Sequence, residues 1–307
     1  MKPYQFLVLS GLTFLAGLFF GAVIQKAYGL GNLLRGVGVP YPTRTPLPTP
    51  GLELDEIPRD YQGEMALFIL AGQSNMVGWA PLPEDQVKDP KIYVFGNDYH
   101  WRIAVEPVDD ASGQVDDVSA DPSAGFGPSL AFASAVRSSR PEMVVGLIPC
   151  AKSSSAIIEW QRNLSDQSLY GSCLKQARAA SPMGHFAGIL FFQGETDAVD
   201  ANLYPQYQPN PMNWSELFSK FVSNLREDLG EPELPVVFAQ IGANTSLDDV
   251  PNWELVQAQQ HSTRLPMSGM IVTDDLPLLD GLHFTAESYR IIGNRFAEAY
   301  LDLLQDE

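Results

Sequence analysis

Residues 66–78 read ALFILAGQSNMVG, an apolar run that ends at a glycine and is followed by polar residues. A continuous apolar run of this length is typical of a strand that is buried on both faces of a sheet. Gly72 lets the chain turn sharply, and a helix after the turn would leave the hydroxyl of Ser74 at the carboxyl end of the strand. The stretch therefore predicts a strand, a turn and a helix, with a serine at the turn.

Similar apolar runs recur along the rest of the chain, at residues 92–95, 143–148, 188–192, 236–241 and 270–273. Segments with helical spacing lie between most of them, at residues 129–139, 169–180, 214–229, 253–262 and 285–304. Buried strands that alternate with helices indicate a parallel sheet covered on both faces. We predict an α/β domain over residues 64–307, a three-layer α/β/α sandwich with a mostly parallel five- or six-stranded sheet.

The N-terminal residues have a different character. Residues 6–24 read FLVLSGLTFLAGLFFGAVI and carry no charge. At about 1.5 Å per residue, such a helix nearly spans a hydrocarbon core of roughly 30 Å. Residues 25–29 (QKAYG) make a poor cleavage site, so an uncleaved transmembrane helix within residues 1–30 is favoured over a removed signal peptide.

A proline-rich segment follows, which reads VPYPTRTPLPTPGLELDEIP over residues 39–58. Proline at this density favours extended polyproline II structure, so residues 31–63 are interpreted as a semi-rigid linker, with a ligand for a proline-binding module as the alternative. Basic residues flank the apolar segment on both sides and leave its orientation open. We expect a membrane-anchored protein with an extracytoplasmic domain, because an anchor followed by a long spacer would otherwise have no purpose.

The amino-acid composition limits the classes of partner and cofactor that the protein is expected to bind. Acidic residues outnumber basic ones by 37 to 19, which gives a net charge of −18 and disfavours nucleic acid. The four histidines show no HExxH spacing, so neither a metal nor another cofactor is predicted. Cys150 and Cys173 are either one disulfide or two buried thiols, depending on the compartment.

Polar segments follow the predicted strands, where active sites of parallel sheets gather. They are residues 72–78 (GQSNMVG), 149–155 (PCAKSSS), 193–197 (QGETD) and, before the last helix, 280–283 (DGLH). A serine needs a base to become a nucleophile, and His283 has a suitable ordinary pKa, with Asp280 placed to orient its ring. The alternatives are a helix N-cap for Ser74, a turn at Asp280 and a surface histidine.

These segments together resemble the SGNH hydrolase superfamily, in particular its sialate O-acetylesterase and acetyl-xylan-esterase branch (carbohydrate esterase family six and plant relatives). The branch shows GQSNM, PxAxGGTxI followed by a tryptophan, QGExD and DxxH in this order, and the resemblance covers about residues 65–304. It implies a flavodoxin-like SGNH hydrolase fold, with Ser74 as nucleophile and the pair Asp280–His283 completing a triad. It also implies an oxyanion hole from the backbone N–H of Ser74, the side chain of Gln193 and a backbone N–H of the glycine pair.

The chain departs from this family pattern at the glycine pair, since Gly-Gly-Thr is replaced by Ser153-Ser154-Ser155. We assign the backbone donor to Ser154 rather than to Ser153. If the position needs a positive φ, serine costs about 1 kcal/mol or more relative to glycine. The added atoms would also narrow the pocket, which would favour small acyl groups or weaken activity.

Two further sets of residues have open roles. Glu195 is expected to support the Gln193 loop, although it is also an alternative carboxylate for the triad, and with Asp197 it could hold a divalent metal. The aromatic residues on the predicted rim either form a platform for sugar rings or pack within loops, and they are Trp79, Tyr99, Trp101 and Trp160.

The expected activity is that of a serine esterase that removes acetyl or other short acyl groups from a carbohydrate or small ester through an acyl-enzyme. Two alternatives remain open from the sequence. One is a non-catalytic carbohydrate-binding domain on the same scaffold, suggested by the missing glycines. The other is an esterase of a different small acyl substrate.

Overall fold

A seven-stranded sheet forms the centre of the part of the chain that the computed structural model describes, residues 56–86, 88–243 and 250–305. The strand order is β3-β2-β4-β1-β5-β6-β7. The strands are β1 (Met65–Gly72), β2 (Ile92–Phe95), β3 (Trp101–Ile103), β4 (Val145–Pro149), β5 (Gly184–Phe192), β6 (Val236–Ala239) and β7 (Ser268–Ile271). All pairs are parallel except β2 with β3.

The prediction of five or six strands was wrong, because the sheet has seven strands and the edge strand β3 was not predicted. This strand has three residues, Trp101–Ile103, and pairs antiparallel with β2. An edge strand of this length, with Arg102 at its centre, has neither an apolar run nor a readable alternation. Its pairing depends on the hairpin with β2, which sequence periodicity does not reveal. The other six strands lie where the apolar runs predict them, and the mostly parallel α/β fold is confirmed.

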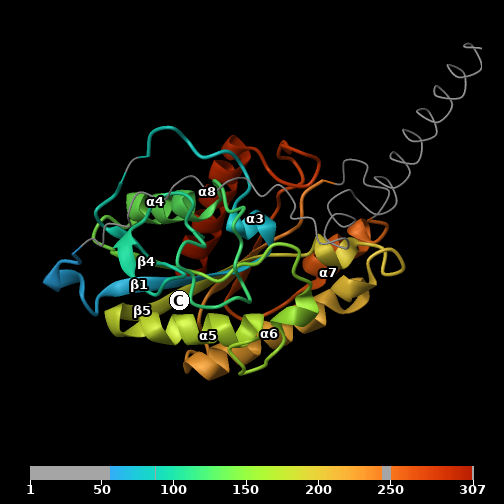
Figure 1. Cartoon of the computed structure of the whole chain (residues 1–307), viewed down its shortest axis with the longest axis horizontal. Coiled ribbons are helices and arrows are strands. Elements are labelled where there is room, and N and C mark those ends of the chain that lie inside the picture. Colours follow the sequence, from blue (N-terminus) through green and yellow to red (C-terminus); the bar gives the residue numbers. More distant parts are fainter. Residues whose placement is uncertain (1–55, 87, 244–249, 306–307) are drawn as a thin grey trace, which may run out of the picture. The chain divides into compact units, whose positions relative to one another are not determined.

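Helices cover both faces of the sheet, as predicted (Figure 1). They are α4 (Ser129–Ser139) and α8 (Ala286–Leu303) on one side, and α5 (Leu169–Ala180), α6 (Trp214–Leu229) and α7 (Trp253–Ser262) on the other. The central strand β1 serves both layers, because alternate side chains of a strand point to opposite faces. Leu67 and Ile69 belong to the core under α5 and α6, whereas Phe68 and Leu70 belong to the core under α4 and α8.

Gly72 ends β1 in a conformation that only glycine adopts readily. Its φ is +137°, and a Cβ here would collide with the backbone carbonyl of Phe192 in the neighbouring β5. The chain then enters the four-residue helix α3 (Ser74–Val77). The glycine thus brings the turn after β1 into contact with the end of β5, where a second polar segment begins.

Cys150 and Cys173 form a disulfide, which settles the choice left open by the sequence. Cys150 directly follows β4 and Cys173 lies in α5, and their Cα atoms are 5.2 Å apart. The bridge therefore ties the segment after β4, which carries Ser153 and Ser154, to the helix that follows it.

The predicted anchor, residues 6–24, lies outside the described residues. Among the helices that the structure describes, none has the length and apolar composition needed to cross a bilayer. The last part of the predicted linker is described, with a turn of 3₁₀ helix at Arg59–Tyr61. Ile57 and Tyr61 pack against the core below α5 and α6, so these linker residues contact the folded domain.

Candidate active site

Ser74 begins α3 at the carboxyl end of β1, and its side chain is almost fully buried. Gln73 holds this turn from both its backbone and its side chain. The backbone N–H of Gln73 donates to Phe192 of β5 over 2.8 Å, and its Oε1 accepts from the N–H groups of Gly194 and Thr196. The turn that carries Ser74 and the segment after β5 are therefore one hydrogen-bonded unit.

His283 lies against Ser74 although 209 positions separate them in the sequence. The hydroxyl Oγ of Ser74 is 2.9 Å from Nε2 of His283. The other ring nitrogen, Nδ1, is 2.8 Å from Oδ2 of Asp280. A carboxylate at Nδ1 holds the proton there and leaves Nε2 as an acceptor for the hydroxyl proton, which is the arrangement that a general base requires.

Asp280 is held as an anion by the turn that it shares with His283. Its Oδ1 accepts the backbone N–H groups of Leu282 and His283, at 3.1 and 2.8 Å. Burial of this partly exposed carboxyl would by itself raise its pKa, but the bonds from the backbone and the ring of His283 hold the pKa below its ordinary value. Asp280 is thus ionised at neutral pH and oriented toward Nδ1.

Asn75 connects the parts of the site and was not singled out by sequence reasoning. Its Nδ2 donates to Oε1 of Glu195 over 2.5 Å and contacts the carbonyl of Leu282 at 3.3 Å. Its Oδ1 accepts the hydroxyl of Tyr289 in α8 over 2.7 Å. The only available signal was its position directly after Ser74 in GQSNM. Its fully buried amide links the turn that carries Ser74 to the loop that carries His283.

Glu195 faces Asn75, whereas the carboxylate that contacts the ring of His283 is that of Asp280. The second carboxylate oxygen of Glu195, Oε2, is buried and has no hydrogen-bond partner among the described residues. Burial raises the pKa of Glu195 to about 7, against the opposing effect of the bond from Asn75. Glu195 is therefore placed to support the turn of Ser74 through its bond to Asn75.

Gln193 is fully buried, and its amide is engaged within the protein. Its Nε2 donates to the carbonyl of Ser155 over 2.9 Å and to Oδ2 of Asp197 over 2.6 Å, and its Oε1 accepts from Trp214 over 2.8 Å. An amide nitrogen has two hydrogens, so both are in use. The expected donation to an oxyanion would require one of these bonds to be exchanged.

Asp197 acts as an anchor for three segments in this arrangement. Besides Gln193, it accepts the backbone N–H groups of Ile157 and Asn210, at 2.8 and 2.7 Å. Burial is the main cause that raises its pKa to about 6. Within residues 56–86, 88–243 and 250–305 no cluster of three or more potential ligands suits a metal ion, and Asp197 faces amides instead.

The serine segment after β4 lies beside the end of β1. The backbone N–H of Lys152 and the hydroxyl of Ser155 both point to the carbonyl of Gly72, at 2.9 and 3.3 Å. Ser154 is exposed and has a φ of +61°, which is the left-handed conformation that glycine adopts at low cost. Ser154 therefore has the positive φ at which serine costs more than glycine.

Replacement of Ser154 by glycine is expected to stabilise the protein. Relief of the left-handed strain is partly offset by the greater freedom of glycine in the unfolded chain, which leaves a gain of roughly 0.5–1 kcal/mol. Denaturant unfolding would measure this gain. Ser154→Ala is the matched control, because alanine removes the exposed hydroxyl but keeps the Cβ, and therefore keeps the left-handed strain. Equal stability changes in both variants would contradict the explanation.

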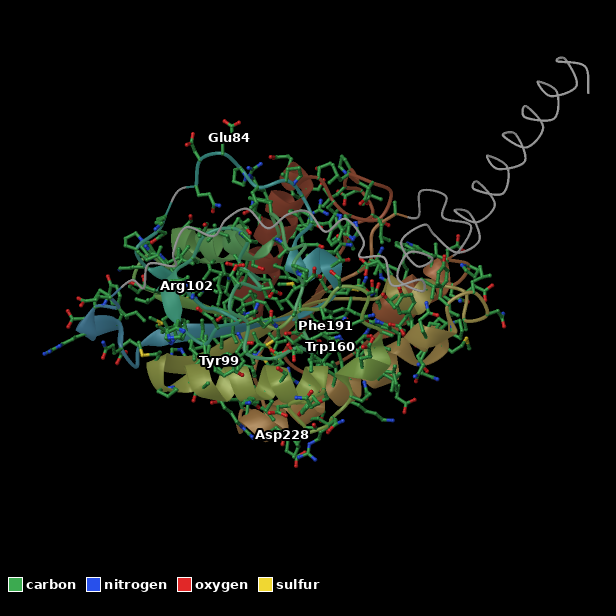
Figure 2. The ribbon with its side chains drawn as sticks, viewed as in Figure 1. Glu84, Tyr99, Arg102, Trp160, Phe191 and Asp228 are labelled. Carbon is green, nitrogen blue, oxygen red and sulfur yellow. A yellow bond between two sulfur atoms is a disulfide. The ribbon has the colours of Figure 1, made fainter. Side chains whose placement is uncertain are left out.

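Three of the four aromatic residues expected on the rim pack within the domain. Trp160 is fully buried, with its ring 5.9 Å from that of Phe191 (Figure 2). Tyr99 and Trp101 both pack on Phe95 of β2, at 5.4 and 5.1 Å between ring centroids. These three residues therefore follow the alternative of loop packing, since their rings contact core side chains.

Trp79 lies in the site itself. Its indole is stacked on the imidazole of His283, with 4.5 Å between ring centroids and 17° between ring planes. The residue is partly exposed.

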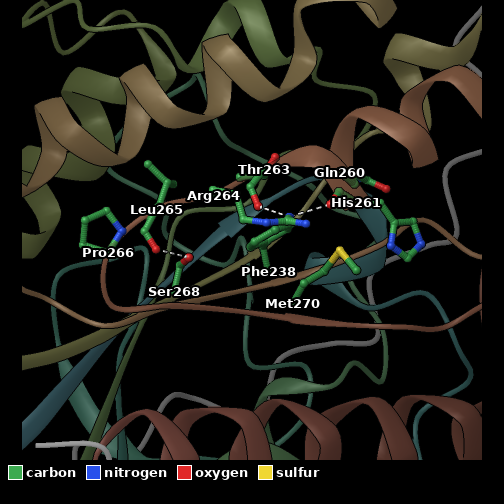
Figure 3. A pocket seen from close by; sticks show the side chains of 9 residues that line it. All are labelled: Phe238, Gln260, His261, Thr263, Arg264, Leu265, Pro266, Ser268 and Met270. Carbon is green, nitrogen blue, oxygen red and sulfur yellow. Dashed lines mark hydrogen bonds between the residues drawn. The ribbon is translucent and has the colours of Figure 1, made fainter.

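A separate pocket of about 450 Å³ lies between β6, β7 and the end of α7 (Figure 3). Phe238 and Met270 line it from the strands, and Arg264 lines it from the connection between α7 and β7. Neither Ser74, His283 nor Asp280 borders this pocket, so it is not the site of the serine–histidine pair.

The chain is similar to known carbohydrate esterases. A family described as "Carbohydrate esterase, sialic acid-specific acetylesterase" matches residues 64–302. The probable carbohydrate esterase At4g34215 of Arabidopsis thaliana is 30% identical over 276 residues, which cover 82% of this chain and 96% of that protein. Its solved structure has a TM-score of 0.64 at 28% identity, covering 78% of this chain and 99% of that chain.

A second solved structure, of the carbohydrate acetylesterase XAC1771 from Xanthomonas citri, has a TM-score of 0.55 at 19% identity. The match covers 79% of this chain and 57% of that chain. At this identity the likeness concerns the fold.

Proposed function

The chain belongs to the sialic acid-specific acetylesterase family of carbohydrate esterases and is a carboxylic ester hydrolase, and we propose that it uses Ser74 as the nucleophile of an acyl-enzyme mechanism. The observation that carries this proposal is the hydrogen-bonded series from Ser74 through His283 to Asp280. Members of the family act on acetyl esters, and the series supplies the groups that acyl transfer requires.

In the acylation step, Oγ of Ser74 attacks the ester carbonyl while Nε2 of His283 takes its proton. The carbonyl carbon becomes tetrahedral and its oxygen becomes negative. The bond between the carbonyl carbon and the sugar oxygen then breaks, His283 gives the proton to that oxygen, and the acetyl group remains on Ser74. In the second half, His283 removes a proton from water, which attacks the acyl-enzyme. The bond to Oγ of Ser74 breaks, His283 returns the proton to Oγ, and acetate is released.

The negative oxygen needs hydrogen-bond donors that are already in place. Two backbone N–H groups are proposed, those of Ser74 and Ser154. The segment of Ser154 lies next to the end of β1 through the bonds of Lys152 and Ser155 to Gly72, which supports this assignment. The amide of Gln193 is proposed to hold the segment by its bond to Ser155, and to join the oxyanion hole only if that bond is exchanged.

The proposed substrate is a carbohydrate that carries a short acyl group. The family supports the acetyl ester, and the chain has Ser153 and Ser154, with their added side chains, where the family pattern has two glycines. A narrow acyl pocket would select acetate because longer chains would collide with its wall. The net charge of −18 repels anions and therefore favours a neutral carbohydrate.

The acyl preference is tested with the full chain and p-nitrophenyl esters of acetate, butyrate and octanoate. We expect kcat/KM to fall by about tenfold or more from acetate to octanoate, since overpacking of a filled pocket costs roughly 1–3 kcal/mol. Ser153→Gly/Ser154→Gly is the matched variant, and it should narrow this difference. A preference for octanoate in the unmodified chain would contradict the proposed short-acyl specificity.

A fluorophosphonate probe separates an esterase from a carbohydrate-binding domain on the same scaffold. The probe should label one serine, and mass spectrometry should find it in the peptide that contains Ser74. Absence of both labelling and ester hydrolysis, with binding of acetylated carbohydrate retained, would favour the non-catalytic alternative.

We also propose that residues 6–24 anchor the protein in a membrane and that residues 31–63 link this anchor to an extracytoplasmic domain over residues 64–307. The charge-free apolar segment and the dense prolines support this organisation. Two measurements test the anchor: extraction of membranes with alkaline carbonate, and sequencing of the N-terminus of the mature protein. Release of the protein by carbonate, or an N-terminus after residue 24, would contradict the proposal.

A further inference from the structure

Trp79 contacts the catalytic histidine through the flat face of its indole. The two rings are nearly parallel, at 17°, and their centroids are 4.5 Å apart. This is closer than the distance of about 6 Å within which a cation over an aromatic face is attracted by the ring. The mechanism proposed above gives His283 a positive charge each time it accepts the proton of Ser74, so the indole lies where a charge would develop.

The backbone around Trp79 holds the indole in place. Gly78, with a φ of +96°, donates from its N–H to the carbonyl of Ser74 and accepts from the N–H of Gly125. Ala80 pairs with Phe126 through two hydrogen bonds, at 3.2 and 2.8 Å. The backbone of Trp79 is thus held on both sides, and its indole is stacked on the ring of His283.

We propose that Trp79 is a positioning residue for His283, which fixes the plane of the imidazole and stabilises its protonated form by stacking. This inference rests on the proposed function, in which His283 is the general base. A platform for sugar rings was one of two alternatives for Trp79, and the face that is stacked on His283 is not available to a sugar ring.

The other groups around His283 do not by themselves account for the proposed stabilisation of its protonated ring. Asp280, from the same loop, is the carboxylate that contacts the ring, and with 43% of its side chain exposed its attraction is partly screened by water. From α3 the ring meets the neutral hydroxyl of Ser74. Glu195, after β5, is linked to the loop of His283 through Asn75. Tyr289, of α8, donates to Asn75 and also contacts Phe284, the residue after His283.

The pKa of His283 tests the proposal without any substrate. In the full chain with isotope-labelled histidines, an NMR pH titration would follow the four imidazole rings, and His283→Gln would identify the signal. Trp79→Leu keeps an apolar cover but removes the aromatic face, so it should lower the pKa of His283 by about 0.5 to 1. Trp79→Phe, with a weaker aromatic face, should give an intermediate value. An unchanged or higher pKa in Trp79→Leu would overturn the proposal.

Kinetics with p-nitrophenyl acetate supply the second measurement. Trp79→Leu should lower kcat about 3- to 10-fold with little change in KM, and the acidic limb of the kcat/KM profile should move to lower pH with the pKa. Trp79→Phe should recover most of the loss. A role in sugar binding would instead raise KM for an acetylated carbohydrate and leave p-nitrophenyl acetate unaffected, which would also overturn the proposal.

The two measurements distinguish the inference from the function on which it rests. One outcome is that the chain has no esterase activity while the pKa of His283 decreases from Trp through Phe to Leu at position 79. In that case the proposed function fails and the stacking effect stands. If activity depends on Ser74 and His283 but the pKa is indifferent to residue 79, the function stands and the inference fails. Should Trp79→Leu not fold, Trp79→Phe alone decides through the same two readouts.

Discussion

Ser74→Ala is expected to lower kcat/KM for p-nitrophenyl acetate by at least about 1,000-fold, because the variant has no hydroxyl with which to form an acyl-enzyme. The folded structure should be almost unaffected. The substitution removes one hydroxyl with its bond to His283, and it leaves the backbone bonds of the turn to Phe192 in place. Initial rates and a thermal unfolding curve on the same preparation would measure both quantities.

Ser138→Ala is a suitable control for this experiment. Ser138 is an exposed serine on α4 whose hydroxyl bonds to the carbonyl of Ser134 within the same helix. It should retain full activity and fluorophosphonate labelling at Ser74. Activity in Ser74→Ala within tenfold of the unmodified protein would sink the nucleophile assignment.

Asp280→Asn is expected to cause the second large loss, by about 100- to 10,000-fold in kcat. An amide at this position presents N–H groups to Nδ1 of His283, which forces the proton onto Nε2 and removes the acceptor for Ser74. The backbone bonds from Leu282 and His283 to the side-chain oxygen can persist, so the turn should remain folded. The kcat values with p-nitrophenyl acetate would show the loss.

Glu195→Gln is the matched substitution for the competing carboxylate. A glutamine can still accept from Nδ2 of Asn75, so we expect less than about a tenfold decrease in kcat. If Glu195 rather than Asp280 were the triad carboxylate, the two variants would exchange their effects. A large loss in Glu195→Gln with an active Asp280→Asn would therefore contradict the assignment.

The same variant should change how stability depends on pH. Burial raises the pKa of Glu195 to about 7, above its ordinary value. Between these two values the folded protein retains a proton that the unfolded chain has lost, so this group destabilises the fold as the pH rises toward 7. Glu195→Gln should make unfolding free energy less dependent on pH in that window.

Most of the fold could be predicted because it follows local patterns. The predicted helices at residues 129–139, 169–180, 214–229 and 253–262 coincide with α4 to α7, and six apolar runs correspond to strands. Period and composition suffice where a segment buries a face of its own. The edge strand β3 was missed since its three residues gain their structure from pairing with β2.

The site was predictable in its residue types and less so in its contacts. Ser74, Asp280 and His283 could be identified because each belongs to a short motif at a strand end or before a helix, and the structure brings all three together. The partners of Asn75, Gln193 and Trp79 could not be predicted. The contacts of Asn75 with Leu282, of Gln193 with Ser155 and of Trp79 with His283 join segments about 40 to more than 200 positions apart, and no local pattern encodes them.

The sequence alone therefore determined that buried strands alternate with helices, that a serine, an aspartate and a histidine follow them, and that serines replace a glycine pair. These properties are local, because they depend on the period of apolar residues and on the identity of single side chains. Only the tertiary structure decided that Ser154 is left-handed, that the amide of Gln193 is occupied, and that Trp79 stacks on His283. Each of these depends on how β1, β4, β5 and the loop before α8 meet at one edge of the sheet, and that meeting is set by packing over the whole domain.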